Sequence, residues 1–129
     1  MRISGLSVMV DDQQKALRFY TEILGFEKKH NIPMGEHSWI TLTAPGEPDG
    51  PELALEPDAH PAAKPFKKAI YDDGIPWTAF SVEDVHEEHK RLEGLGVRFT
   101  REPMDAGTVW VAVFDDTCGN LIQIMAEKS

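Results

Sequence analysis

The chain has 129 residues, of which 41% are hydrophobic and 27% are charged. This composition is typical of one globular domain and excludes a largely disordered chain, because enough apolar surface is present to offset chain entropy. The 13 basic and 22 acidic residues give a formal net charge of −9. We therefore expect neither nucleic acid nor an anionic membrane as a partner, since both need a positive field.

The single cysteine, Cys118, excludes an intramolecular disulfide and a cysteine-rich zinc site. No apolar stretch approaches the roughly 20 residues that cross a bilayer. Residues 1–10 also lack the pattern of a signal peptide. These features predict a cytoplasmic protein.

The first half of the chain predicts a strand, a helix and then three strands. Residues 2–10 alternate between two faces, as a strand does. Asp11 or Asp12 caps the helix that follows, and Gly25 ends it. The three further strands are predicted at residues 26–30, 38–43 and 52–56. A Pro- and Ala-rich connector then leads into about two helical turns before Asp72.

The second half repeats this order. Residues 77–82 alternate, Asp84 caps a helix, and Gly96 ends it. Strands are predicted at residues 98–102, 109–114 and 121–125. The matching residues lie about 70 positions apart: Val10 and Val82, Asp12 and Asp84, Gly25 and Gly96, Trp39 and Trp110, and Ala54 and Gln123.

This repeat predicts an α+β fold of two βαβββ modules, with cup-shaped sheets and with the helices outside. The single domain, residues 1–129, divides into a first module (1–57), a connector with a short helix (58–74) and a second module (75–129). In each module one sheet face is apolar and the other is mixed in polarity. A concave face with a few aromatic and polar groups is a usual place for a small ligand.

Three segments carry a resemblance to a known family: residues 10–26 with Phe-Tyr-x-x-x-Leu-Gly-Phe, residues 77–84, and residues 114–124. They resemble the vicinal oxygen chelate superfamily, also called the glyoxalase/bleomycin resistance/dioxygenase superfamily. The resemblance implies paired βαβββ modules and a homodimer. It also implies a protein class that contains metal-dependent isomerases and dioxygenases together with metal-free drug-binding proteins.

In the enzymes of this superfamily four side chains hold a divalent metal. The resemblance puts the four positions at Gly5, Ala54, Trp77 and Gln123. Glycine and alanine offer no ligand atom, tryptophan offers only an N–H donor, and glutamine is a weak neutral ligand. We therefore expect no metal and no other cofactor. A fourth strand shifted by two residues would bring Glu56 or Glu52 to the cup in place of Ala54, which leaves a divalent metal as the alternative.

Several side chains are candidates for the site. Glu56 and His37 are the candidate catalytic residues, since a carboxylate in an apolar cup or an inward histidine can move a proton. His86 and His89 have the i, i+3 spacing of metal ligands, but their charged neighbours favour a solvated helix face. The residues expected to bind a ligand are Ser7, Met9, Trp39, Ala54, Glu56, Trp77, Trp110 and Gln123.

Three functions follow as hypotheses. The leading one is a protein that binds a small organic molecule in its cup without a metal. The second is a metal-dependent lyase, isomerase or dioxygenase that uses Glu56 and Gln123. The third is a structural dimer whose cup is filled by Trp77, Met9 and Met125.

Overall fold

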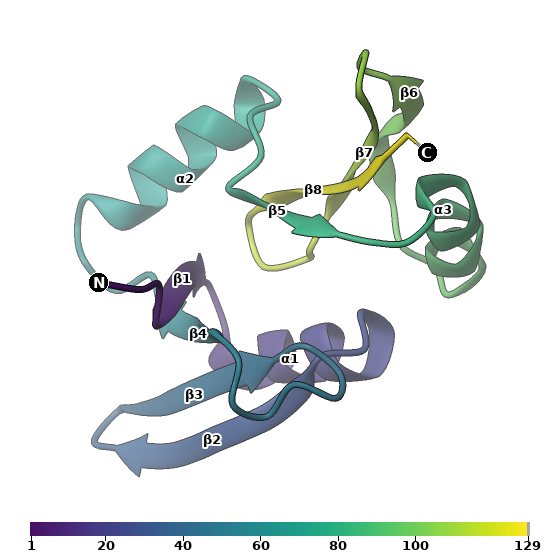
Figure 1. The fold of residues 1–129 in the computed structure, drawn as a ribbon. Helices are drawn as coiled ribbons and strands as arrows, with labels where there is room; N and C mark the ends of the chain where they lie inside the picture. Colours follow the sequence, from purple (N-terminus) through teal and green to yellow (C-terminus); the bar gives the residue numbers. More distant parts are fainter. Residues whose placement is uncertain (129) are drawn as a thin grey trace. The chain divides into compact units, whose positions relative to one another are not determined.

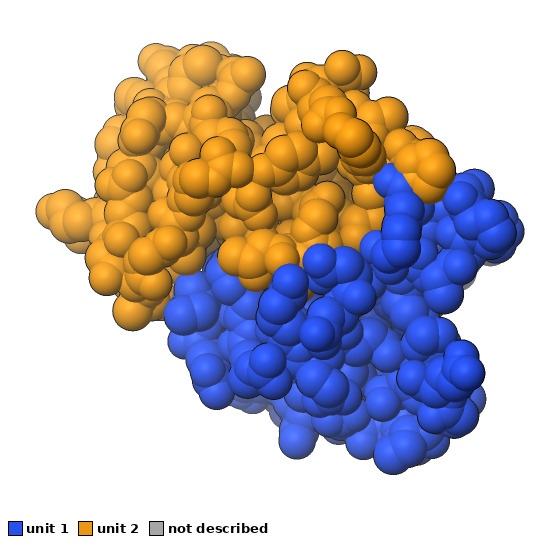
Figure 2. Space-filling view, turned by 180° about the vertical axis from the view of Figure 1, so that it is seen from behind, with its two compact units in different colours: residues 1–64 blue, residues 65–129 orange. Residues whose placement is uncertain are grey.

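The structure is a computed structural model and describes residues 1–128. Two compact units, residues 1–64 and residues 65–129, make up the chain (Figure 2). Each unit contains one four-stranded sheet (Figure 1). The predicted α+β fold of two βαβββ modules is confirmed.

In the first unit, helix α1 continues directly into a π-helical segment, η1, and the strands follow it (Figure 1). The sheet order is β1-β4-β3-β2, with β1 parallel to β4 and the other pairs antiparallel. The elements are β1 (Gly5–Val10), α1 (Gln13–Arg18), η1 (Phe19–Ile23), β2 (Glu27–Met34), β3 (His37–Thr43) and β4 (Glu52–Pro57).

After helix α2, the second unit repeats the order of one strand, one helix and three strands, with the sheet order β5-β8-β7-β6. Its elements are α2 (Ala63–Asp72), β5 (Thr78–Ser81), α3 (Val85–Gly94), β6 (Phe99–Asp105), β7 (Val109–Asp115) and β8 (Leu121–Glu127). Helix α2, which the sequence assigns to the connector, packs within this unit. There Lys67 donates to the carbonyl oxygen of Cys118 at 2.9 Å, and the Tyr71 hydroxyl donates to Asp115 at 2.5 Å.

The two predicted helix starts are formed by equivalent caps. The carboxylate of Asp12 accepts a hydrogen bond from the amide of Lys15 at 3.0 Å, and that of Asp84 accepts one from Glu87 at 3.1 Å. Each bond satisfies an amide that the first helical turn leaves unpaired. Gly25, just beyond the first helix, has a φ of +94°, a conformation that favours glycine.

Alternate strand residues form the core of the first unit. Val8, Val10, Ile40, Leu42 and Leu55 are each at most 1% exposed. They lie on the face that α1 covers, where Ala16 and Tyr20 are fully buried. The neighbouring residues in each strand point the other way, because successive side chains alternate. We call that other surface, with Ser7, Trp39, Thr41 and Ala54, the open face of the first sheet.

The strand register corrects one part of the predicted repeat. Thr41 pairs with Ala54 in the first sheet, and Val113 pairs with Gln123 in the second. Since Ala54 and Gln123 are equivalent, Thr41 corresponds to Val113, and Trp39 corresponds to Val111 rather than to Trp110. The predicted match of the two tryptophans is wrong because a slip of one residue moves a side chain to the opposite face.

Among residues 1–128, no helix combines the length and the apolar character that crossing a membrane requires.

Candidate functional site

The open face of the first sheet carries a hollow of about 260 Å³. Neighbouring strands supply its centre, because Ser7 on β1 pairs with Ala54 on β4, which pairs with Thr41 on β3. Small side chains at these positions leave the hollow open. The residues around it include Ser7, Trp39, Thr41, Glu52, Ala54 and Glu56.

The strand register brings all three candidate residues of β4 to the same face of the sheet. Glu52, Ala54 and Glu56 all lie on the open face and all line the hollow. Ala54 is 7% exposed at the middle, and the two glutamates are half-buried at the ends. The predicted alternatives, Ala54 or a glutamate, are therefore both present at this face.

Glu52 is an ion-paired carboxylate at one end of the hollow. Its carboxylate oxygens lie 3.7 Å from the Nζ of Lys29 and 3.8 Å from the Nε2 of His30, both on β2. A hydrogen bond with the neighbouring hydroxyl of Thr41 is the main cause that lowers the pKa of the Glu52 carboxyl; burial opposes it, and the nearby Lys29 and His30 lower the pKa further. Glu52 therefore stays ionised at neutral pH.

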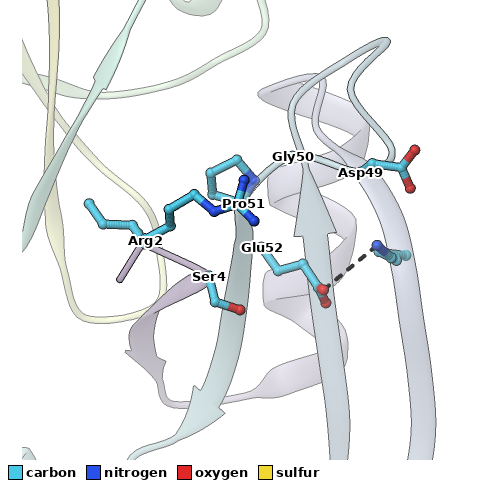
Figure 3. Close-up of a pocket in the computed structure, with 8 residues that line it drawn as sticks. Arg2, Ser4, Asp49, Gly50, Pro51 and Glu52 are labelled. Carbon is cyan, nitrogen blue, oxygen red and sulfur yellow. Dashed lines mark ion pairs between the residues drawn. The ribbon is translucent and has the colours of Figure 1, made fainter.

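A second, wider hollow of about 650 Å³ adjoins the first one at Glu52. Figure 3 shows its lining, with the ion pair from Glu52 to Lys29 as a dashed line. Arg2 and Asp49 lie on its rim (Figure 3). Because Arg2 and Asp49 are exposed, this hollow is open to solvent rather than enclosed.

Glu56 differs from Glu52 in having no counter-ion. The residues that the structure describes make no hydrogen bond or ion pair to its side chain, although it is half-buried. A partly buried carboxylate without a partner loses hydration that nothing replaces. Glu56 is thus the group on this face that gains most from a ligand carrying a positive charge or a hydrogen-bond donor.

Trp39 and Thr41 complete the surface around Glu56. The indole of Trp39 is 41% exposed and lines the hollow, so an aromatic surface is available there. The side chain of Thr41 is only 1% exposed, and its hydroxyl interacts with the carboxylate of Glu52. Thr41 therefore helps to fix Glu52 at one end of the hollow.

Gln13 holds the two strands that present these side chains. Its Nε2 donates to the carbonyl oxygens of Ser38 at 2.7 Å and Leu55 at 2.8 Å, and its Oε1 accepts from the amide of Ser38 at 3.0 Å. Ser38 precedes Trp39, and Leu55 precedes Glu56. The pairing of β3 with β4 covers only Thr41 and Leu42, so the Gln13 side chain bridges the strands beyond the ladder.

Other predicted site residues lie elsewhere. Trp110 pairs with Ala126, on the face opposite Gln123, where its ring contacts His86 at 4.8 Å between centroids. The structure therefore does not bring Trp110 to the same surface as Gln123. His37 lines a different hollow, beside Asp11 and the start of α1.

The second sheet carries the remaining candidates. Gln123 pairs with Ala79 and Val113, and all three lie on the face opposite α3. Trp77 precedes β5, is half-buried, and packs edge to face on Phe66 of α2 with 5.9 Å between ring centroids.

The first sheet does not fit the metal that the resemblance implies. Gly5 and Ala54 have no donor atoms, and Glu52 already has Lys29 as a partner. A larger residue at position 5 is also disfavoured, because a Cβ there would lie 3.0 Å from the carbonyl oxygen of Glu52. The one carboxylate left is Glu56, and a single carboxylate does not make a metal site.

The second sheet fits the metal no better, since Trp77 supplies no lone pair and Gln123 is neutral. Within residues 1–128, the three acidic or histidine side chains close enough to share an ion lie at another place, on α3 and β6.

Sequence reasoning missed Thr41 and Gln13. Thr41 has the same strand parity as Trp39, so alternation alone would have placed it on the open face. Gln13 leaves no comparable signal, because its partners lie 25 and 42 residues away in the chain.

Comparisons with known proteins agree with this fold. The family model of the Glyoxalase/Bleomycin resistance protein/Dioxygenase superfamily matches residues 2–124. Protein YurT of Bacillus subtilis is 55% identical over 97% of this chain and 98% of its own length. A probable lactoylglutathione lyase of Synechocystis sp. is 29% identical over 95% of this chain and 92% of its own.

Solved structures are also similar. UcmS2 has a TM-score of 0.83 and 32% identity, with 97% of each chain covered. TnmS3, an antibiotic binding protein from Streptomyces sp. CB03234, has a TM-score of 0.79 and 25% identity, covering 99% of this chain and 97% of its own. With a duplicated βαβββ fold and a family match over nearly its whole length, this chain belongs to the glyoxalase/bleomycin resistance protein/dioxygenase superfamily.

Proposed function

We propose that this protein binds a small organic molecule on the open face of its first sheet, without a metal ion. The observation that carries the proposal is the lining of the hollow: the exposed indole of Trp39 beside Glu56, a half-buried carboxylate that has no counter-ion among the described residues. The similarity to TnmS3, an antibiotic binding protein, supports a binding role.

The lining also indicates the chemistry of the ligand. An aromatic ring stacks well on Trp39, and a basic group near the ring gains from both the indole and Glu56. The volume of about 260 Å³ is close to the lower end of ordinary ligand sites, about 300–1,000 Å³. The proposed ligand is therefore one aromatic ring system with an amine or another strong hydrogen-bond donor.

Three probes that share the indole ring system and differ in charge test this proposal: tryptamine, indole and indole-3-acetate at pH 7. Binding is followed by the thermal midpoint and by isothermal titration calorimetry. Tryptamine should bind more tightly than indole, and indole-3-acetate most weakly. Glu56→Gln should remove the preference for the cation, whereas Glu83→Gln, at an exposed position in the second unit, should leave it unchanged.

Two results would contradict the proposal. The first is an unchanged charge preference in Glu56→Gln, which would place the probes at another surface. The second is a stoichiometric metal that stays bound in the wild type and is lost in Glu52→Gln or Glu56→Gln. That result would assign the open face to a metal after all.

An enzymatic role is the second candidate, supported by the similarity to the probable lactoylglutathione lyase. In that role Glu56 would be the base, since it is the unpaired carboxylate of the hollow. The role requires turnover of lactoylglutathione in the presence of added Zn²⁺ or Ni²⁺, and loss of that turnover in Glu56→Gln with the fold intact. Absence of turnover with both metals would remove this candidate.

A further inference from the structure

A cluster of three potential metal ligands lies in the second unit, on α3 and β6, away from the hollow described above. The Nε2 atom of His89 is 2.6 Å from a carboxylate oxygen of Glu102 and 3.4 Å from one of Glu93. One ligand atom from each of the three residues lies within 4.8 Å of the other two. His89 and Glu93 are one helical turn apart on α3, and Glu102 belongs to β6.

The imidazole of His89 is held in a defined orientation. Its side chain is only 15% exposed, so the predicted solvated helix face is wrong for this residue. The ring packs edge to face on Phe99 with 4.5 Å between centroids, because α3 covers this side of the second sheet. His86, three residues earlier, contacts Trp110 instead and takes no part in the cluster.

The Nε2 atom of His89 is the second feature that points to a ligand. It is buried, yet it makes no hydrogen bond of acceptable geometry, even though the Glu102 oxygen is so close. An Nε2 atom that faces two carboxylates at these distances needs a cation between them, either the proton of an imidazolium or a metal ion. The same three atoms that share the proton in an ion pair can bind a metal ion in its place.

The spacing suits a small divalent ion. With bonds of about 2.0–2.1 Å to nitrogen and oxygen, neighbouring ligands of tetrahedral zinc are about 3.3 Å apart. The Nε2 atom of His89 and the nearer carboxylate oxygen of Glu93 are already 3.4 Å apart. The side chain of Glu102 is 71% exposed and that of Glu93 49% exposed, so both can rotate by the small amount that is needed.

We propose that His89, Glu93 and Glu102 bind one divalent transition-metal ion, with zinc as the expected occupant. Three protein ligands leave a fourth position for water. Because the ligands come from α3 and β6, the bound ion ties the helix to the edge strand of its sheet. This site is independent of the proposed ligand-binding face, and its failure would leave that proposal untouched.

Calorimetric titration of the tag-free, EDTA-treated protein with ZnCl₂ at pH 7.5 tests the site. We expect one zinc per chain and a rise in the thermal midpoint on addition of zinc. His89→Ala and Glu102→Gln should each weaken binding by about tenfold or more and remove the rise. His86→Ala is the matched control on the same helix and should bind zinc as the wild type does.

Two results of the zinc titration would overturn the proposal. The first is zinc binding that persists in both His89→Ala and Glu102→Gln, which would show that the ion binds elsewhere. The second is the absence of binding at millimolar zinc. If His89→Ala does not fold, Glu93→Gln and Glu102→Gln decide the question, because both glutamates are exposed and their replacement leaves the packing intact.

Discussion

Removing the side chain of Gln13 should destabilise the first unit more than its half-buried position alone would suggest. The amide makes three hydrogen bonds to main-chain atoms of Ser38 and Leu55, at 2.7, 2.8 and 3.0 Å. The pairing of β3 with β4 covers only Thr41 and Leu42, so no ladder hydrogen bond joins Ser38 to Leu55. Gln13 therefore replaces strand pairing at a place where the sheet provides none.

The magnitude follows from these three bonds. Each contributes about 0.5–1.5 kcal/mol net, and a buried group left unpaired costs about 1–3 kcal/mol. Leu55 is 1% exposed, whereas Ser38 is half-buried and regains water in part. We expect Gln13→Ala to lower the free energy of unfolding by about 2–3 kcal/mol.

Urea denaturation followed by circular dichroism measures this change. Gln14→Ala is the control, since Gln14 is the next helix residue and is exposed. Its effect should stay within about 0.5 kcal/mol. Because Gln13 holds the main chain beside Trp39 and Glu56, tryptamine binding should weaken as well. A loss below about 0.5 kcal/mol in Gln13→Ala would refute the reasoning that these bonds replace strand pairing.

Two further predictions concern the second unit. Burial raises the pKa of Asp115, but hydrogen bonds to its carboxylate, first the one from Tyr71, outweigh burial, so that the pKa is lowered. Burial and the neighbouring Asp115 raise the pKa of Tyr71. Asp115 therefore stabilises the folded protein above its unfolded pKa of about 3.9, and this stabilisation is lost as the pH falls through the lower folded pKa. The stabilisation from Tyr71 is lost as the pH rises above about 10. Tyr71→Phe should cost most stability near pH 7 and less at pH 3 and pH 10.5, and an equal cost in urea melts at all three would contradict this. Gly119 and Gly107 have similar φ values, +95° and +94°, but only at Gly119 would a Cβ meet another side chain, 2.9 Å from the Nζ of Lys67. Relief of that contact moves the buried ammonium of Lys67 away from the carbonyl oxygen of Cys118. Gly119→Ala should therefore cost about 1–3 kcal/mol more than Gly107→Ala, and equal midpoints of the two variants in thermal denaturation would refute this reasoning.

Local sequence signals predicted the helix boundaries well. The caps at Asp12 and Asp84 and the terminating Gly25 and Gly96 all act within a few residues of the helix they bound. Such interactions depend only on neighbouring residues, so a sequence shows them directly. The strands were predicted less completely, and β2 extends to Met34, beyond the predicted end at His30.

The candidate site was predicted in part. Alternation correctly put Ser7 and Ala54 on one face, and the register pairs them. The prediction for Trp110 was wrong, because the alignment of the two halves was one residue out of register in that strand. An error of one position is small in a sequence alignment, but in a strand it exchanges the two faces.

The sequence by itself determined the duplicated α+β fold and the absence of metal ligands at Gly5 and Ala54, because periodicity, caps and residue identity are local properties. Only the tertiary structure decided that, within residues 1–128, Glu52 is ion-paired while Glu56 is not, and that His89 lies beside Glu102. These differences depend on contacts between segments far apart in the chain. Such contacts are set by strand register and helix packing, which no short stretch of sequence contains.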